Sequence, residues 1–225
     1  MLLQILVAPL SGMQGIEVFQ LNCRRKKMKR LWILFICLML ILPANSMAQQ
    51  EAVTFKIDPV HTSILFTVRH LMINKVHGKF KKFSGEIQYN EKDITKSSVK
   101  VTVDAASINT DNQRRDNDLR SKNFLMVEKY PEITFVSKKI RKQGDGFVAI
   151  GDLTLHGVTR EVQIPFEITA VINDPWGNKR MGVEGSFEIN RRDYDILWNR
   201  TMDNGGLVVG NKVKIEFNLE AIAAK

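Results

Sequence analysis

Cysteine is almost absent from the sequence, and this absence restricts the class of protein. The 225 residues include two cysteines, Cys23 and Cys37, and both precede residue 49. Residues 49–225 therefore contain no thiol, which excludes a disulfide-stabilised scaffold for this part of the chain. A stretch of this length buries enough apolar surface to fold without disulfides.

Long apolar runs are also scarce, and the one pronounced run covers residues 31–42. Basic residues at 24–30 precede this run, and Ser46 and Ala48 follow it in a small-x-small arrangement. This order is typical of a secretory signal peptide, and we predict cleavage after Ala48 and a periplasmic location. The alternative is a membrane anchor, but the run is shorter than the roughly 20 residues that a spanning helix needs.

This cleavage site divides the chain into an N-terminal extension with signal peptide, residues 1–48, and one domain, residues 49–225. It also changes the charge that the domain carries. The whole chain has 33 basic and 24 acidic residues, a net charge of +9, whereas residues 49–225 retain 27 basic and 23 acidic residues. The remaining charge of +4 is small and mixed with acids throughout, which argues against a nucleic-acid partner.

Helical periodicity is rare after residue 53, and alternation of apolar and polar residues dominates instead. Such a period of two indicates strands with one buried face. We expect about eight antiparallel strands, near residues 64–70, 80–89, 99–105, 133–135, 147–155, 161–172, 183–189 and 212–221. One polar stretch, residues 111–127, is interpreted as a short helix followed by a loop.

About eight strands with one apolar face must close into a barrel or pack as two sheets, because otherwise the face and the edges stay exposed. A barrel of this size can hold one small ligand. Twelve phenylalanines against three tyrosines indicate an interior with few polar groups. The sequence leaves open whether these rings fill a core or line a cavity.

Motifs for catalysis and metal binding are missing. The chain has no G-x-S-x-G sequence, and its glycine pairs lack the strand-to-helix setting of phosphate loops. Four histidines, His61, His70, His77 and His156, show neither H-x-H nor H-E-x-x-H spacing, so no metal site is expected. Lys79, which neighbours Phe80, is interpreted as a surface lysine over a buried ring. We expect no catalytic residue and no cofactor.

Five stretches of the chain resemble motifs of one known family. Residues 58–70 are similar to a D-x-x-H-S-x-x-x-F-x-V-x-H strand, 78–85 to G-x-F-x-x-F-x-G, and 151–159 to a G-D-L-T-x-x-G-x-T turn. Residues 109–135 resemble the family's single helix with the strand that follows, and 189–194 resemble I-N-R-x-D-F/Y. The chain thus resembles the YceI family of polyisoprenoid-binding, lipocalin-like proteins.

This resemblance implies an all-β, antiparallel, lipocalin-like β-barrel with an apolar tunnel that carries an isoprenoid lipid, such as a quinone tail or a polyprenyl phosphate. It implies no catalytic residues. The ligand-binding residues that we expect are wall residues and residues at the mouth: Phe66, Phe80, Phe83, Phe135, Phe166 and Phe187 in the wall, and His70, Arg120 and Arg192 at the mouth. A transient membrane contact and a homodimer are compatible with this role.

Two other functions remain open at the level of sequence. One is a secreted enzyme that acts on a hydrophobic substrate inside the barrel, which requires a polar cluster deep in the interior. The other is a stress-related interaction module with a vestigial cavity, which requires a filled core.

Overall fold

The computed structural model describes residues 52–203 and 205–224. The predicted extension and signal peptide, residues 1–48, lie outside the described residues. In the described part of the chain, no helix has both the length and the apolar character needed to cross a membrane.

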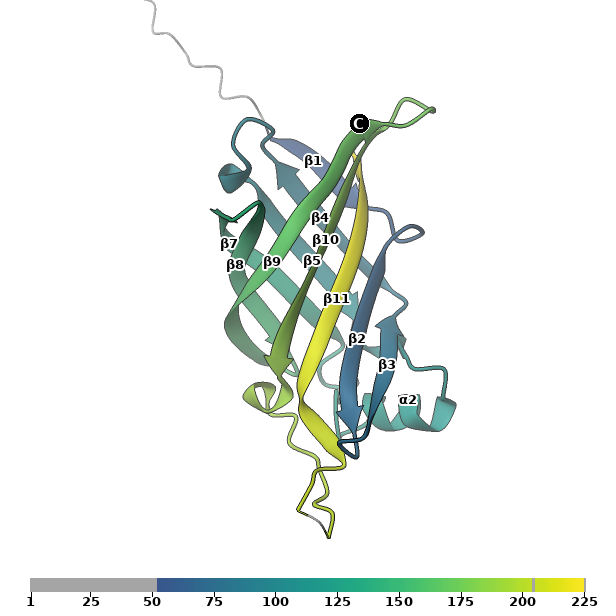
Figure 1. The fold of residues 1–225 in the computed structure, drawn as a ribbon. Coiled ribbons are helices and arrows are strands. Elements are labelled where there is room, and N and C mark those ends of the chain that lie inside the picture. The colour runs from purple at the N-terminus through teal and green to yellow at the C-terminus, as the bar shows by residue number, and fades with distance from the viewer. Residues whose placement is uncertain (1–51, 204, 225) are drawn as a thin grey trace, which may run out of the picture. The chain divides into compact units, whose positions relative to one another are not determined.

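Strands make up most of the described chain, as the alternation predicts (Figure 1). In the described residues, one α-helix and three short 3-10 helices lie between the strands. The elements are β1 (Val53–Ile57), β2 (Ser63–His70), β3 (Asn74–Phe80), β4 (Phe83–Tyr89), η1 (Ile94–Lys96), β5 (Ser98–Asp104), η2 (Ala105–Ser107), β6 (Ile108–Asn109), α2 (Gln113–Arg120), β7 (Glu132–Gln143), β8 (Gly146–Leu155), β9 (Val158–Asn173), β10 (Lys179–Asn190), η3 (Arg191–Tyr194) and β11 (Val209–Ala223).

Pairing between the first and the last strand closes the sheet. β1 is hydrogen-bonded to β4 on one side and to β11 on the other, with Phe55 opposite Ala223. The closed ring is β1-β4-β5-β7-β8-β9-β10-β11, eight strands that are antiparallel throughout. The predicted antiparallel barrel of about eight strands with one short helix is therefore confirmed.

Three further strands continue the sheet from β11. β2 pairs with β11 and β3, and β3 pairs with β6. The expected strand at residues 80–89 is thus the last residue of β3, a break at Lys81 and Lys82, and the whole of β4. This break places Phe80 and Phe83, which are three residues apart, on two separate strands.

Helix α2 lies in the polar stretch where one short helix is expected, and it lies beside β3 and β6 (Figure 1). The side chain of Asn112 caps its first turn by accepting a 3.0 Å hydrogen bond from the backbone N–H of Arg115. Buried Asp116 accepts bonds from the backbone N–H and the hydroxyl of Thr110, at 2.8 and 2.6 Å. These bonds fasten the helix to the end of β6.

The barrel interior contains two apolar clusters. The smaller one surrounds Phe55, Met181 and Ala221, which are almost fully buried where β1, β10 and β11 meet. The larger one includes Phe66, Phe135 and further residues toward η3. The closed ring and both clusters belong to residues 53–223, so this part of the chain carries a complete core of its own.

Candidate functional site

A cavity of about 270 Å³ lies inside the barrel. Residues of almost every strand line it, from Tyr89 and Ser97 near η1 to Ile196 and Val209 near η3. The lining is apolar except for four side chains, those of Tyr89, Ser97, Thr134 and Arg191. Such a cavity can bury a hydrocarbon chain, since removal of apolar surface from water is favourable and needs no specific polar partner.

Five of the six predicted wall residues line this cavity. The alternation along each strand turns these rings inward. The five residues are Phe66, Phe80, Phe135, Phe166 and Phe187. Phe66 and Phe80 contact each other across the β2–β3 pair, with ring centroids 5.8 Å apart. The sixth, Phe83, is half-buried at the start of β4 and is not part of the lining. That these rings contact a ligand stays a prediction.

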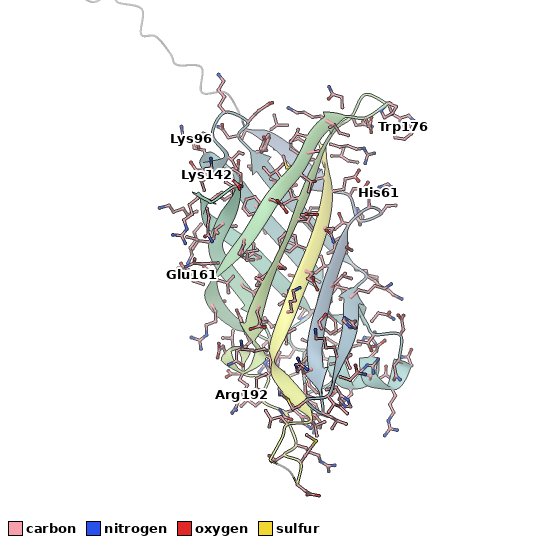
Figure 2. All side chains as sticks on the ribbon, in the orientation of Figure 1. His61, Lys96, Lys142, Glu161, Trp176 and Arg192 are labelled. Carbon is pink, nitrogen blue, oxygen red and sulfur yellow. The ribbon has the colours of Figure 1, made fainter. Side chains whose placement is uncertain are left out.

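The structure places the three predicted mouth residues away from the cavity lining. His70 is exposed at the end of β2, and Arg192 is exposed on the outside of η3 (Figure 2). Arg120 donates hydrogen bonds to the backbone carbonyl oxygens of Ala106 and Ile108, at 2.7 and 2.6 Å. Its guanidinium therefore links the end of α2 to η2 and β6, which contain these two carbonyls.

Arg191 is the charged residue that does line the cavity, whereas the expected mouth residue was its neighbour Arg192. Only 4% of Arg191 is exposed, and its guanidinium donates to the carbonyls of Gly210 and Ile196, at 3.0 and 2.6 Å. It also reaches the carbonyl of Val209 and the side chain of Asn211. All these partners are neutral oxygens. Burial lowers the pKa of Arg191, and the positive charge of the adjacent arginine lowers it further.

Strand alternation was the signal that could have identified Arg191. Along β10 the cavity-lining residues are odd-numbered: Met181, Val183, Phe187 and Ile189. Continuing this period of two places residue 191 inward and residue 192 outward. The motif I-N-R-x-D-F/Y carries the same signal, because its arginine falls on residue 191 and its variable position on residue 192.

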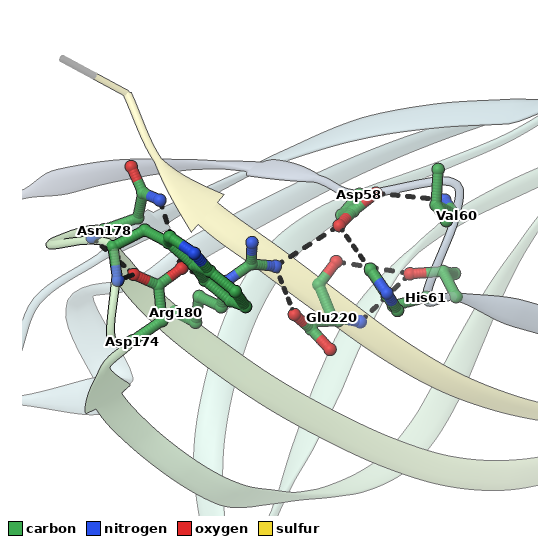
Figure 3. A network of polar contacts seen from close by, with 9 residues as sticks. Asp58, Val60, His61, Asp174, Asn178, Arg180 and Glu220 are labelled. Atoms are coloured by element: carbon green, nitrogen blue, oxygen red, sulfur yellow. Dashed lines mark hydrogen bonds and ion pairs between the residues drawn. The ribbon is translucent and has the colours of Figure 1, made fainter.

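A polar network occupies the opposite end of the barrel, where β1, β10 and β11 meet (Figure 3). Arg180 is at its centre: Nε donates a 2.7 Å bond to Asp174 Oδ2, and the same guanidinium binds Glu220 and lies 3.3 Å from Asp58 Oδ2. His61 Nδ1 lies 2.8 Å from Asp58 Oδ2. Three chain segments that are distant in sequence are thereby joined.

The electrostatics of this network favour the charged forms of Asp174, Asp58 and Arg180. The Arg180 guanidinium holds the pKa of Asp174 far below its usual range, and the hydrogen bond from His61 is the main cause of the lowered pKa of Asp58. Asp174 in turn raises the pKa of Arg180. Ligand atoms of Asp58, His61 and Glu220 lie within 4.8 Å of one another. Because Arg180 already binds the carboxylates of Asp58 and Glu220, we interpret these three residues as part of the ion-pair network and not as a metal site.

Comparison with known proteins agrees with the resemblance. The family model described as YceI-like domain matches residues 55–221. A UPF0312 protein of Serratia proteamaculans is 37% identical over 176 residues, covering 77% of this chain and 88% of that protein. UPF0312 protein VPA0850 of Vibrio parahaemolyticus is 37% identical over 169 residues, covering 75% of this chain and 88% of its own.

Solved structures share the barrel. The Campylobacter jejuni YCEI protein is 29% identical, with a TM-score of 0.61 over 70% of this chain and 90% of that one. Burkholderia cenocepacia BcnA has a TM-score of 0.65 at 22% identity, over 73% of this chain and 98% of its own. A polyisoprenoid binding domain from Saccharophagus degradans, implicated in plant cell wall breakdown, has a TM-score of 0.54 at 16% identity, over 76% and 99% of the two chains. These last two similarities concern the fold.

Proposed function

The chain belongs to the YceI-like family, and we propose that it binds the hydrocarbon chain of an isoprenoid lipid in its barrel cavity. The observation that carries the proposal is the long apolar lining, from Tyr89 at one end to Arg191 at the other. Each 100 Å² of lipid surface removed from water contributes about 2.5 kcal/mol of binding free energy. The neighbour from Saccharophagus degradans, which is described as polyisoprenoid-binding, supports the same ligand class.

The volume of the cavity adds a condition to this proposal. About 270 Å³ is just below the range of roughly 300–1,000 Å³ that is common for small-molecule sites. A long polyprenyl tail therefore requires wall side chains such as Phe66 and Phe80 to rotate, or it leaves part of its length outside the barrel.

The lining favours binding over catalysis. No His, Asp or Glu belongs to the described lining, so the hydroxyls of Ser97 and Thr134 have no general base in the cavity. The proposed role is that of an exported carrier, with residues 1–48 directing the chain to the periplasm and being removed there. The head group of the lipid is not part of the proposal, because His70, Arg120 and Arg192 do not line the cavity.

Extraction of the purified protein tests the proposal. Residues 49–225 are produced in a bacterial periplasm, and bound lipids are extracted with organic solvent and identified by mass spectrometry. Stripped protein is then offered a polyprenol and a straight-chain alcohol of equal carbon number. We expect a prenyl lipid in the extract and tighter uptake of the polyprenol. Repeated absence of prenyl lipid, together with failure to take up polyprenol, would overturn the proposal.

A further inference from the structure

The β2–β3 hairpin is unusual in its charge. The sequence has no acidic residue between Asp58 and Glu86. The basic residues in this interval are Arg69, Lys75, Lys79, Lys81 and Lys82, together with three histidines. Among the described residues, none of these five basic side chains forms an ion pair. The hairpin therefore carries the unpaired positive charges of Arg69, Lys75 and Lys79, and Lys81 and Lys82 follow it in the break before β4.

The strand register concentrates this charge on the outer surface. Arg69 lies opposite Lys75, and both side chains are exposed. Like charges directly opposite each other in a sheet are destabilising, so the charges of this pair do not stabilise the fold. On the adjacent strand β11 the lysines are neutralised, since Lys212 binds Glu188 and Lys214 binds Glu216, each at 2.8 Å.

The tip of the same hairpin combines backbone strain with apolar exposure. Leu71 and Met72 have φ values of 49° and 62°, and the N–H of Ile73 closes the turn on the carbonyl of His70. Two consecutive left-handed residues in a hairpin turn normally select Asn-Gly. Here the tip exposes 48% of Met72 and 82% of Ile73 instead. Strain of this kind clusters at functional positions.

The tip also touches the segment that ends the cavity. The N–H of Leu71 donates a 2.8 Å hydrogen bond to the carbonyl of Val208, and the next residue, Val209, lines the cavity. Figure 1 shows the β2–β3 turn at the same end of the barrel as the segment that follows η3. Leu197 of that segment is 56% exposed. The apolar tip (Met72 and Ile73), the basic pair Arg69 and Lys75, and the cavity-lining residue Val209 thus lie at the same end of the barrel.

We propose that the β2–β3 hairpin docks this end of the barrel onto a bilayer that contains anionic phospholipids. Met72 and Ile73 enter the interface between headgroups and acyl chains, where apolar side chains at the end of a basic element are favourable. The basic side chains of the hairpin contact headgroup phosphates, and each basic residue near an anionic surface contributes about fivefold in affinity. The inference goes beyond the proposed function and does not depend on which ligand the cavity takes.

Cosedimentation with lipid vesicles tests docking. Residues 49–225 are mixed with vesicles of phosphatidylcholine and phosphatidylglycerol at 3:1, or of phosphatidylcholine alone, all free of isoprenoid lipid. We expect binding to the anionic vesicles that weakens with salt. Arg69→Gln with Lys75→Gln, which removes the two charges beside the tip, should reduce affinity about 25-fold. Met72→Ser with Ile73→Ser should reduce it at least fivefold while the thermal midpoint is retained.

Matched controls exclude a general effect of charge or of apolar exposure. Lys139→Gln with Lys142→Gln removes the same charge from exposed positions of β7, and Trp176→Ser removes an exposed ring, 79% exposed, from the opposite end (Figure 2). Both variants should bind vesicles like the parent. Equal losses in the two charge variants would overturn the proposal. A second outcome would also overturn it: the variant Met72→Ser with Ile73→Ser binds vesicles like the parent, and the parent binds duplex DNA as tightly as vesicles. A non-specific site for polyanions would then explain both kinds of binding.

Since the barrel part lacks cysteine, Ile73→Cys and Val60→Cys each accept a single environment-sensitive fluorophore. The label at position 73 should shift to the blue on anionic vesicles, and the label at position 60, on the β1–β2 connection near the other end, should not. A shift at position 60 alone would place the membrane contact at the wrong end. If Met72→Ser with Ile73→Ser loses vesicle binding but still takes up polyprenol, membrane docking and ligand binding depend on different parts of the barrel.

Discussion

Arg180 Nε donates a 2.7 Å hydrogen bond to Asp174 Oδ2, across the turn that joins β9 to β10 (Figure 3). Asp174 also accepts from the backbone N–H groups of Trp176 and Asn178, at 2.9 and 2.8 Å, so one carboxylate orders the whole turn. Through the same guanidinium, Arg180 reaches Asp58 after β1 and Glu220 on β11. One ion-pair network therefore fastens the strands that close the ring.

Replacing Arg180 should destabilise this end of the barrel. Arg180→Met leaves Asp174, whose side chain is 4% exposed, and Asp58 without their cation, and an uncompensated buried carboxylate is unfavourable. We expect the thermal midpoint to fall by several degrees. Glu220→Gln should cost less, because that side chain is 33% exposed. Equal midpoints for Arg180→Met and the parent would contradict the role of the network.

The same network predicts a dependence of stability on acid. The pKa values of Asp174 and Asp58 are lowered in the folded protein, so their contribution is complete above the unfolded value of about 3.9 and is lost as the pH falls toward the folded values. Thermal melts between pH 7 and pH 2 should show this loss. Asp174→Asn should lower the midpoint at pH 7 and flatten the fall below pH 4. An unchanged slope in this variant would contradict the assignment.

Arg191 and Arg192 form a matched pair of neighbours for mutation. Arg191→Met leaves the carbonyls of Gly210 and Ile196 without their buried donor, and we expect a loss of about 2–4 kcal/mol in the free energy of unfolding. Arg192→Met should change it by less than about 0.5 kcal/mol, because that side chain is exposed. Urea denaturation measures both. A larger effect at 192 would mean that the alternation argument fails.

Filling the cavity should abolish ligand uptake without unfolding the barrel. Ala149 is the smallest lining residue and is 2% exposed. Ala149→Leu should reduce polyprenol uptake at least tenfold, while overpacking costs about 1–3 kcal/mol of stability. Ala170→Leu, at an exposed position of β9, serves as the control. Undiminished uptake by Ala149→Leu would place the ligand elsewhere.

Strain at the hairpin tip predicts a stabilising substitution. Met72 has a φ of 62°, which is unfavourable for a residue with a side chain. Met72→Gly should raise the free energy of unfolding by about 0.5 kcal/mol, since the relief of strain exceeds the extra entropy of glycine in the unfolded chain. The same variant should bind anionic vesicles more weakly. A fall in stability would show that the turn is not strained.

The alternation of residues predicts most of the fold, and its failures have local causes. β9 and β11 run for 16 and 15 residues, long enough for the period of two to identify them. β1 is absent from the expected strands because it has five residues and ends at a break before β2. The division of 80–89 depends on the break at Lys81, where no glycine or proline marks a turn in the sequence.

The sequence predicts the phenylalanine rings of the cavity wall, but it does not predict the polar contacts between residues that are far apart along the chain. Alternation places Phe135 and Phe166 in the cavity wall. It cannot reveal that Arg120 binds backbone carbonyls, because every residue has a carbonyl group and the sequence does not show which ones a side chain reaches. Nor can it pair Asp58 with Arg180, which come together only when the ring closes. Contacts of this kind are set by the three-dimensional arrangement of the strands.

Pairing of β1 with β11 has a consequence for the order of events during folding. Phe55 and Ala223 lie at the two ends of the domain, so their contact has the longest loop to close, and loop closure slows folding. Until β11 is available, β1 and β10 are open edges that can pair with other chains. We therefore expect ring closure to be a late and slow step, and truncation before residue 209 to yield an aggregating chain.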